Sequence, residues 1–553
     1  MKLNGAQILL ECLKANGVDT VFGFPGGKVI PLYDELFKVQ DSISHIMTAD
    51  EQGAAHAADG YARVTGRTGV CIATSGPGAT NLVTGIAGAY MDSIPMVAIT
   101  GNVGTVWLGR DSFQEVDIVG MTMPVTKHNY QVRNVDDMQR IVNDAFYIAR
   151  EGRPGPVLID IPVNIFTAQT EYDPDRNHAS KQKKAQETDL TEAIALISES
   201  KHPVIFAGGG VVKSNASAEL LAFAEKLNAP VASSLMGLCG FPNDHELFTG
   251  MIGMHGTKAS NMAVMNCDLL IVLGSRFSDR VVGMMDKFAP EAKILQIEID
   301  PAEVNKNIST HYHIIGDVKE ILQKLNALIQ RANRKEWLDH ISQWKAEDEK
   351  KQPAAHEGRI VISQIHELAD RDAIIVTDVG QHQMWTAQYY NFCEDNTLCT
   401  SGGLGTMGYG LGAAIGAKFG APGRQVFLVT GDGSFRMNLN EMSTVSCYNL
   451  PLVTVLLDNN TLGMVRQWQN MFFGKRYSST DLCDLDFCTI AKGFGIKSWM
   501  VDDVRNFKNA LSQAIEYGGP AFIHCKINTD TMVLPMVPPG ESIDNLLMYE
   551  GEL

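Results

Sequence analysis

Two apolar runs in the last third of the chain each end in a polar segment that could hold a charged ligand. Val426–Thr430 leads into Gly431-Asp432-Gly433, and Pro451–Leu457 leads into Asp458-Asn459-Asn460. If the two runs are strands of one parallel sheet, their polar ends meet at its carboxyl edge, where α/β proteins bind ligands. The aspartate and the asparagine then offer the hard oxygen ligands that Mg²⁺ requires. The glycines let backbone N–H groups approach a phosphate, toward which the following helix turns its positive end, so the residues predict a metal-bridged diphosphate site.

The separation of the two segments makes the prediction more specific. Asp432 and Asn459 stand 27 positions apart, and GDG followed at this distance by NN resembles the motif with which enzymes bind thiamine diphosphate (ThDP). A lone GDG is more often a tight turn. It is the pairing of both motifs with the ends of apolar runs that favours a cofactor site over a coincidence of strand ends.

Composition limits the class of protein. The chain has 553 residues, of which 45% are hydrophobic, and a formal net charge of −17. These values predict a globular protein of about three or four domains and argue against nucleic acid and anionic membranes as partners. We find no apolar run that predicts a transmembrane helix and no signal or transit peptide, and we expect a cytoplasmic protein. The ten cysteines lack metal-binding spacing and are expected to be buried reduced thiols, for example Cys12, Cys71, Cys267 and Cys447.

Apolar runs alternate with helical patterns in three blocks, which predicts three doubly wound α/β domains with parallel sheets. We expect the domains over 1–170, 189–332 and 358–535, followed by a tail over 536–553. Charged segments at 171–188 and 333–357 are interpreted as linkers, the second of them partly helical. The first and third blocks share their size and rhythm, which hints at duplication. The expected strands are Val18–Phe24, Gly69–Thr74, Met96–Thr100 and Val157–Ile161; Pro203–Ala207, Pro230–Ser233, Leu269–Leu273 and Ile294–Ile299; and Ala373–Thr377, Val426–Thr430, Leu452–Leu457 and Ala521–Lys526.

Motifs of the first block extend the resemblance to ThDP enzymes. A single glycine cluster there could be a simple strand-to-helix turn, but three clusters upstream of GDG match the family's pyrimidine-binding domain. Nearly the whole chain resembles the catalytic subunit of acetohydroxyacid synthase, also called acetolactate synthase. The segments that carry the resemblance are Gly26-Gly27, Glu51-Gln52-Gly53, Ser75-Gly76-Pro77-Gly78-Ala79-Thr80-Asn81, Phe113-Gln114-Glu115, Gly152-Arg153-Pro154-Gly155-Pro156, Gly253-Met254-His255-Gly256, Arg276-Phe277-Ser278-Asp279-Arg280, Gly380-Gln381-His382-Gln383-Met384-Trp385, Ser401-Gly402-Gly403-Leu404-Gly405-Thr406-Met407-Gly408, Gly463-Met464-Val465-Arg466-Gln467-Trp468-Gln469 and Met536-Val537-Pro538-Pro539-Gly540.

This resemblance implies a pyrimidine domain, a central Rossmann-like domain and a diphosphate domain, in that order. It also implies a ThDP-dependent transferase that decarboxylates pyruvate. The resulting hydroxyethyl enamine would condense with pyruvate or 2-ketobutyrate to give 2-acetolactate or 2-aceto-2-hydroxybutyrate for branched-chain amino-acid biosynthesis. ThDP would lie between the first domain of one chain and the third domain of another, so a homodimer would be the minimum active unit. A homotetramer and a separate small regulatory subunit are further assemblies that the family suggests.

The resemblance also assigns cofactor contacts. Glu51 would hydrogen-bond the aminopyrimidine N1′ of ThDP, and Met407 would prop the cofactor in its bent shape. Asp432, Asn459 and the main-chain carbonyl of Thr461 would bind Mg²⁺. The family's Asn pair, aligned through Gly463-Met464-Val465, falls one residue before the literal Asn459-Asn460, and Asn459 is a candidate in both registers. The remaining ThDP contacts are expected from Gly26, Gly27, Gln381, His382, Gly431, Gly433, Ser434 and Met464.

Four residues are expected to handle the substrates. Arg280 resembles the arginine that clasps the carboxylate of the second substrate, where a planar bidentate donor fits, although such an arginine could also form a surface ion pair. Trp468 resembles the tryptophan that favours 2-ketobutyrate over pyruvate as acceptor. Phe113 and Gln114 resemble lid residues over the reacting centre.

The central block resembles the family's FAD-binding domain. Gly208-Gly209-Gly210 follows the run Pro203–Ala207, and glycine after a strand permits close approach of the backbone to a pyrophosphate. The flavin would be structural, because carboligation transfers no net electrons. Its contacts are expected from Arg153, Gly208, Gly209, Gly210, Met254, His255, Arg276 and Asp317.

Several positions depart from the family's usual pattern, and two alternatives therefore stay open. One is another ThDP-dependent 2-ketoacid decarboxylase or carboligase, such as a flavin-free catabolic acetolactate synthase, against which Trp468 and the motifs around Met254 and Arg280 argue. The other is a catalytically silent ThDP-fold binding protein, against which the intact cofactor motifs argue. The departures are Asp50, Arg110, Val163, Ser278 and Gly412, which stand where the family usually has His, Thr, Lys, Asp and Pro.

Overall fold

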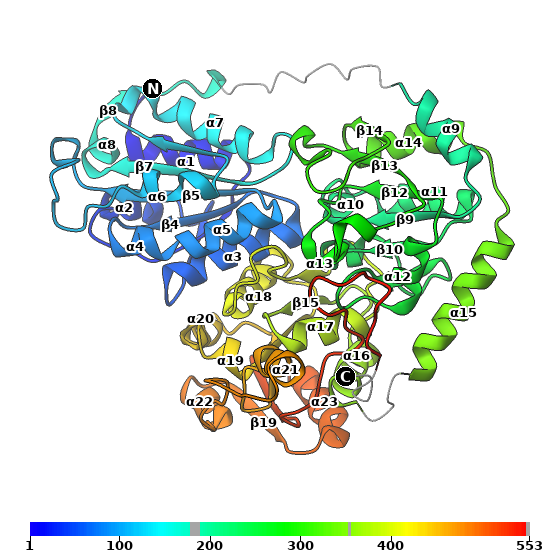
Figure 1. The fold of residues 1–553 in the computed structure, drawn as a ribbon. Coiled ribbons are helices and arrows are strands. Elements are labelled where there is room, and N and C mark those ends of the chain that lie inside the picture. The colour runs from blue at the N-terminus through cyan, green and yellow to red at the C-terminus, as the bar shows by residue number, and fades with distance from the viewer. Residues whose placement is uncertain (177–188, 352–355, 549–553) are drawn as a thin grey trace.

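Three α/β domains make up the molecule. The computed structural model describes residues 1–176, 189–351 and 356–548, and in Figure 1 the first domain is blue to cyan, the central one green, and the third yellow-green to red. Each contains a six-stranded, wholly parallel sheet with helices packed against it. The predicted fold class is thereby confirmed. No helix in these ranges is both long and apolar enough to cross a membrane.

The first domain is built on the sheet order β3-β2-β4-β5-β7-β6. Its first and last segments are joined by a short antiparallel ladder between β1 (Lys2–Asn4) and β8 (Gln169–Glu171). Helix α3 (Glu51–Thr65) and helix α5 (Val83–Asp92) lie on the side that meets the third domain. The six strands are β2 (Thr20–Gly23), β3 (Ser44–Met47), β4 (Gly69–Ala73), β5 (Met96–Asn102), β6 (His128–Gln131) and β7 (Pro156–Pro162).

The third domain repeats this arrangement with the order β16-β15-β17-β18-β20-β19. When the strands of each domain are counted along the chain, both sheets run second, first, third, fourth, sixth, fifth. This shared permutation fits the hint of duplication in the sequence. The strands are β15 (Ile374–Thr377), β16 (Leu398–Cys399), β17 (Val426–Gly431), β18 (Val453–Asp458), β19 (Lys497–Val501) and β20 (Ala521–Lys526).

The central domain has a different strand order, β11-β10-β9-β12-β13-β14. Counted along the chain this is third, second, first, fourth, fifth, sixth, the order of dinucleotide-binding Rossmann folds, in which the ligand lies where the order reverses. The reversal falls between β9 and β12, next to helix α10 (Gly209–Lys213). The strands are β9 (Pro203–Ala207), β10 (Val231–Ser233), β11 (Phe248–Met251), β12 (Leu269–Leu273), β13 (Lys293–Glu298) and β14 (Tyr312–Ile315).

The twelve strands expected from apolar runs all exist, but each sheet contains two more that the sequence did not indicate. The missing strands are the two outermost of every sheet: β3 and β6, β11 and β14, β16 and β19. The helical segment expected after Gly431-Asp432-Gly433 consists of the single turn α19 (Asp432–Phe435), a 3-10 turn and α20 (Met442–Cys447).

The first and third domains pack through two helices that cross at small residues. A Cβ added to Gly60 of α3 would lie 2.1 Å from the main-chain oxygen of Ala413 in α18 (Tyr409–Gly420), and one added to Gly416 would lie 1.8 Å from that of Ala57. Gly412, where the family usually has Pro, belongs to the same crossing, since its Cβ would lie 2.8 Å from Cβ of His56. Glycine is thus required by close packing at this interface.

The C-terminal segment returns from the third domain to the central one (Figure 1). The main-chain N–H of Val537 donates to the oxygen of Met254 at 2.7 Å, and the Asn261 amide donates to the oxygen of Ile543 at 2.8 Å. The linker expected at 333–357 contains helix α15 (Lys335–Lys351), whereas most of the linker expected at 171–188 lies outside the described residues.

The cysteines are free thiols, as expected, but they are not all buried. Cys12, Cys71 and Cys267 lie in the apolar core. Cys447 is exposed, because it is the last residue of α20 and lies on the outward face of that short helix. The prediction of burial was therefore wrong for this residue.

Candidate active site

The ends of β17 and β18 lie side by side and bring the two polar segments together. The strands pair in parallel with Gly431 opposite Leu457, so Asp432 and Asn459 follow at the same carboxyl edge. A cavity of about 80 Å³ opens there. Ten residues predicted to bind ThDP or Mg²⁺ line this cavity, namely Gln381, His382, Met407, Gly431, Asp432, Gly433, Ser434, Asn459, Thr461 and Met464.

Asp432 is the buried acidic residue of this cavity. Its side chain is 2% exposed, and its Oδ2 has no hydrogen-bond partner among the residues that the structure describes. Burial, followed by the nearby Asp458 carboxylate, raises the pKa of Asp432 above its ordinary value. A buried carboxylate oxygen without a partner destabilises the folded protein unless a cation binds it, so Asp432 is suited to be a metal ligand.

A second carboxylate stands behind the first and is fully neutralised by its neighbours. Asp458 Oδ2 accepts from Nε2 of His524 at 2.6 Å and from Nζ of Lys526 at 2.7 Å. Burial opposes ionisation of Asp458, but these two hydrogen bonds hold its pKa below the usual range. Burial alone would lower the pKa of His524, yet its bond to Asp458 raises it to about 9. Asp432 is therefore the group left for an added cation.

Asn459 is held in one orientation. Its Nδ2 donates to Oε1 of Gln381 at 3.1 Å, and Nε2 of Gln381 donates to the main-chain oxygen of Thr531 at 2.8 Å. The amide oxygen of Asn459 accepts from the N–H of Thr461 at 3.3 Å. The oxygen side of Asn459 thus faces Thr461, the third predicted ligand. In the described ranges no three His, Cys, Asp or Glu side chains cluster as a metal site would require, and a set of carboxylate, amide and carbonyl oxygens suits Mg²⁺.

His382 supplies a neutral ring at the same edge. Burial lowers the pKa of His382 to about 3, so the imidazole carries no charge at neutral pH. Its Nε2 is buried without a hydrogen-bond partner in the described part of the chain. An unpaired ring nitrogen on a residue that lines this small cavity can donate to a phosphate oxygen once a ligand binds.

A second, much larger cavity of about 1270 Å³ lies among the three domains. This volume exceeds the range of about 300–1,000 Å³ typical of small-ligand sites. Met407 and Met464 line both cavities, so the two are neighbours. Of the predicted FAD contacts, those that line the large cavity are Arg153, Gly209, Gly210, Met254, His255, Arg276 and Asp317.

Gly208 is the predicted FAD contact that does not line the large cavity. A Cβ on Gly208 would lie 2.3 Å from the main-chain oxygen of Gly274, so this glycine allows two strand ends to pack closely. Asp317 also has a local function, because its Oδ1 accepts from the N–H of Lys319 at 2.9 Å and of Glu320 at 3.2 Å and so caps helix α14 (Val318–Leu328).

Arg153 connects the first domain to the central one at the cavity wall. Its Nη1 lies 2.9 Å from a carboxylate oxygen of Glu303, and its Nε donates to Oγ of Ser93 at 2.8 Å. Glu298 ends β13 on the same wall and was not singled out in the sequence. Asp432 was predicted because an acidic residue follows an apolar run. Glu298 lies at the end of an apolar run too, so the same pattern would have indicated it.

Arg280 and Trp468, the predicted specificity residues, are neighbours at the large cavity. The guanidinium carbon of Arg280 lies 5.9 Å from the centre of the Trp468 ring, and Nη1 donates to Sδ of Met254 at 3.8 Å. The Arg280 side chain is 62% exposed, and within the described ranges it forms one loose ion pair, with Asp279 at 3.8 Å. Most of its donors are therefore available to a substrate carboxylate.

Three family models, one for each domain of the thiamine pyrophosphate enzymes, match the chain in the order of its three domains. They describe the N-terminal TPP-binding domain at 3–121, the central domain at 190–325 and the C-terminal TPP-binding domain at 378–525. Curated relatives include the large subunit of acetolactate synthase isozyme 2 from Escherichia coli, 44% identical over 551 residues and covering 99% of both chains. The acetolactate synthase large subunit of Corynebacterium glutamicum is 44% identical over 563 residues, covering 98% of this chain and 89% of that one. A probable large subunit from Methanocaldococcus jannaschii is 43% identical over 565 residues, covering 99% and 95%.

This chain belongs to the acetolactate synthase large-subunit family. Its ThDP-binding fold is that of the thiamine pyrophosphate enzymes, and the predicted resemblance is confirmed.

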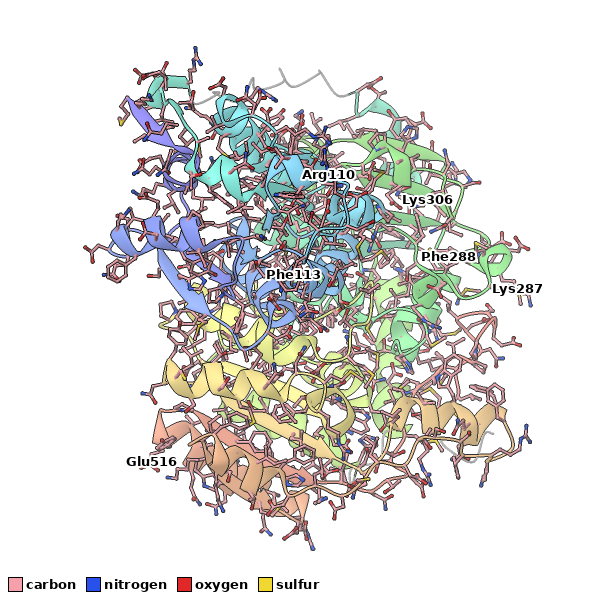
Figure 2. The ribbon with its side chains drawn as sticks, turned by 90° about the vertical axis from the view of Figure 1, so that its left-hand side faces the viewer. Arg110, Phe113, Lys287, Phe288, Lys306 and Glu516 are labelled. Atoms are coloured by element: carbon pink, nitrogen blue, oxygen red, sulfur yellow. The ribbon has the colours of Figure 1, made fainter. Side chains whose placement is uncertain are left out.

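The ThDP and lid residues predicted in the first domain lie apart from both cavities of their own chain. Gly26, Gly27, Glu51, Phe113 and Gln114 line neither cavity. Phe113 is 83% exposed, and Figure 2 shows it near Arg110 on one face of the first domain. Within a single chain, Phe113 and Gln114 therefore do not cover either cavity as the expected lid residues would.

Glu51 begins helix α3 and is held from two sides. Its Oε2 accepts from Nδ2 of Asn81 at 3.0 Å. Asp50, which stands where the family usually has His, caps the helix through a 2.7 Å bond from the N–H of Gln52. Glu441 of the third domain, which the sequence did not indicate, accepts from the N–H groups of Ala49 and Asp50, each at 3.1 Å. Three carboxylates thus fix the start of α3, and one of them comes from another domain.

Proposed function

We propose that the protein is an acetolactate synthase that joins two 2-ketoacids, pyruvate with pyruvate or with 2-ketobutyrate, and releases CO₂. One observation carries the proposal. The Asp432–Asn459 cavity, suited to a metal-bound diphosphate, adjoins a larger cavity that presents Arg280 and Trp468, and two methionines line both. A cofactor held in the first cavity could therefore meet a carboxylate bound in the second.

The chain fits Mg²⁺ and thiamine diphosphate at the third-domain edge. Asp432, Asn459 and the carbonyl of Thr461 would hold the metal, and His382 with the glycines around Asp432 would hold the diphosphate. When bound, thiamine diphosphate supplies a carbon nucleophile and an electron sink for decarboxylation. Met407 would support the cofactor from the apolar side.

The remaining residues of the chain orient substrates and move a proton. Arg280 would bind the carboxylate of the second 2-ketoacid through two parallel hydrogen bonds, and the Trp468 ring beside it would contact the acceptor's alkyl group. Glu51 would hold a proton at the aminopyrimidine nitrogen, a task for which a buried carboxylate is suited. The Glu51 side chain is only 8% exposed.

We further propose that a second copy of the chain completes the site. Glu51 lines neither cavity of its own chain, so its role requires the third domain of a partner. The loop region after β5 exposes the large apolar side chains that such a partner would cover, namely Val106, Trp107, Phe113, Met121 and Met123. A homodimer is thus the minimum active unit, and a homotetramer and a small regulatory subunit would be further assemblies.

FAD is our proposal for the large cavity. The Rossmann strand order, the volume of about 1270 Å³ and the cations Arg153 and Arg276 on the wall support a dinucleotide. Burial lowers the pKa of Arg276 from its ordinary value without threatening its charge. The flavin would be structural, since joining two 2-ketoacids involves no net electron transfer.

A product assay on purified protein tests the function. With ThDP, Mg²⁺, FAD and pyruvate we expect 2-acetolactate, and with added 2-ketobutyrate we expect 2-aceto-2-hydroxybutyrate to dominate. Acetaldehyde as the main product would contradict the proposal and favour a decarboxylase. Absence of product with bound cofactor would favour a silent binding protein.

Trp468→Leu tests the acceptor site separately. Loss of the ring should shift the product ratio toward 2-acetolactate by about tenfold, the size of effect that a missing apolar contact produces. Trp499→Leu is the matched control, because Trp499 lies on the edge strand β19 and lines neither cavity. An unchanged ratio in Trp468→Leu would remove Trp468 from the acceptor site.

A further inference from the structure

One loop contributes residues to the walls of both cavities. It runs from Ser401 to Gly408, between β16 and α18. Ser401, Gly402, Gly403 and Gly405 line the large cavity, and Met407 lines both. The position of this loop therefore sets the shape of both sites at once.

The composition of the loop gives it little stiffness of its own. Four of its eight residues are glycine, and two of these adopt positive φ angles, 68° at Gly405 and 88° at Gly408. Glycine loses more conformational freedom on ordering than any other residue. Apart from a 3.1 Å bond from the N–H of Thr406 to Oγ of Ser401, the loop's polar contacts reach outward, so it is ordered from outside.

The first outside contact comes from another domain. Asp92, the last residue of α5, accepts from the N–H of Gly403 at 2.7 Å through Oδ1 and from that of Gly402 at 3.1 Å through Oδ2. Its side chain is fully buried, and Nη2 of Arg63 donates to Oδ2 at 2.8 Å. One carboxylate of the first domain thus binds two successive amides at the start of the loop.

Arg63 is itself fixed by a buried network. Its Nε donates to Oδ1 of Asp59 at 2.6 Å, and the hydroxyl of Tyr409 donates to the same oxygen at 2.6 Å. Tyr409 begins α18, immediately after the loop. The network therefore runs from the start of the loop through the first domain and back to its end. Removing one member of such a pair destabilises the folded protein because it leaves a buried charge without a partner.

The second outside contact comes from the third domain. Asp378 follows β15 and accepts from the N–H of Gly408 at 2.8 Å through Oδ1. Its Oδ2 accepts from Oγ1 of Thr430 at 3.3 Å. Asp378 is 1% exposed, so it has no solvent to stabilise its charge and depends on these donors. Met407 thus lies between two loop ends that are each bound by a buried carboxylate.

We propose that Asp92 and Asp378 are positioning residues that clamp the Met407 loop from two domains and thereby set the affinity for ThDP. This inference rests on the proposed binding of ThDP at the third-domain edge. Neither carboxylate lines the small cavity, although Asp92 also lines the large one, so each acts on the small cavity through the loop rather than by touching the cofactor there. Loss of a clamp would leave the ligands of Mg²⁺ intact and would loosen only the support of the cofactor.

The central domain offers a matched control. Asp348 accepts from the N–H of Lys258 at 2.9 Å and from that of Ala259 at 3.0 Å, one oxygen to each. It is 7% exposed and lines neither cavity. Asp348→Asn therefore removes the same kind of two-amide carboxylate contact as Asp92→Asn, far from the loop.

The test compares these two variants without substrate. Hydrogen exchange of peptides covering 401–408 is measured in protein free of ThDP, and the Kd for ThDP with Mg²⁺ is measured by calorimetry. In Asp92→Asn we expect loop exchange and Kd each to rise by about tenfold, the factor that corresponds to loss of one charged hydrogen bond. In Asp348→Asn both should stay at the wild-type values even where thermal stability falls. Equal values in wild type and Asp92→Asn, or equal losses in both variants, would overturn the clamp.

Two additions keep the test decisive. If Asp92→Asn does not fold, Arg63→Lys keeps the charge but loses the paired geometry, and it should raise loop exchange by a few fold; no change would overturn the clamp. If wild type binds no ThDP, the proposed function fails, while the exchange measurement still decides whether Asp92 orders the loop.

Discussion

The first and third domains share one strand order but present different chemistry at the same edge of the sheet. In the third domain, the carboxyl edge holds a cavity with polar atoms of Asp432 and His382 that have no partner among the residues described. In the first domain, Glu51 is already hydrogen-bonded by Asn81 and lines neither of the two cavities described above. The same fold thus carries a binding site in one copy and a single positioned carboxylate in the other, which illustrates that function resides in the side chains placed on a fold.

Substituting the key residue of the first or the third domain should give the largest effects on activity. Both Glu51→Ala and Asp432→Ala should lower carboligation by at least about 100-fold, since one removes the proton-holding group and the other the metal ligand. Only Asp432→Ala should weaken the binding of ThDP with Mg²⁺ by a similar factor, measured by calorimetry. Equal weakening in both variants would contradict the division of labour between the domains.

The packing between the two domains should be the next most sensitive feature. Gly416→Ala places a Cβ where 1.8 Å separates it from the main-chain oxygen of Ala57, and we expect the free energy of unfolding to fall by about 1–3 kcal/mol. Gly423→Ala is the control, because nothing lies within 4 Å of its added Cβ. Denaturant unfolding measures both, and equal stability of the two variants would show that α3 and α18 do not need the close crossing.

The charge network behind the metal site should give a smaller, pH-dependent effect. Burial alone would lower the pKa of His524, but the hydrogen bond to Asp458 raises this pKa from 6.5 to about 9. The stabilisation of the folded protein by protonated His524 is therefore complete below pH 6.5, the pKa in the unfolded chain, and is lost as the pH rises through about 9. The free energy of unfolding should therefore decrease between pH 7 and 10 by at most roughly 3 kcal/mol. His524→Gln should flatten this part of the profile, and a slope equal to that of wild type would contradict the assignment.

The sequence predicted the middle of every sheet and missed its borders. Strands such as β5, β7, β17 and β18 are buried along their whole length and form continuous apolar runs. Edge strands such as β3, β6, β14 and β19 are partly exposed and mix polar with apolar residues. A strand buried on both faces gives a strong apolar signal, and an edge strand does not.

The candidate site shows a similar limit. Asp432 and Asn459 follow strongly apolar strands at a diagnostic spacing, so the sequence indicates them directly. Asp92 and Glu441 act across the interface between the first and third domains, and no local pattern marks a contact between residues more than 300 positions apart. Motifs thus identify the residues expected to meet the ligands, while the groups that hold those residues in place emerge only from the packed structure.

Mixing two inactive variants tests the central claim most directly. If Glu51 of one chain serves the Asp432 edge of another, a dimer of Glu51→Ala with Asp432→Ala contains one intact site. Random re-association of equal amounts should then restore about a quarter of wild-type carboligation, because half of the dimers are mixed and each has one site of two. Recovery near this level would support a site shared between chains. No recovery, with mixed dimers verified by mass spectrometry, would contradict it.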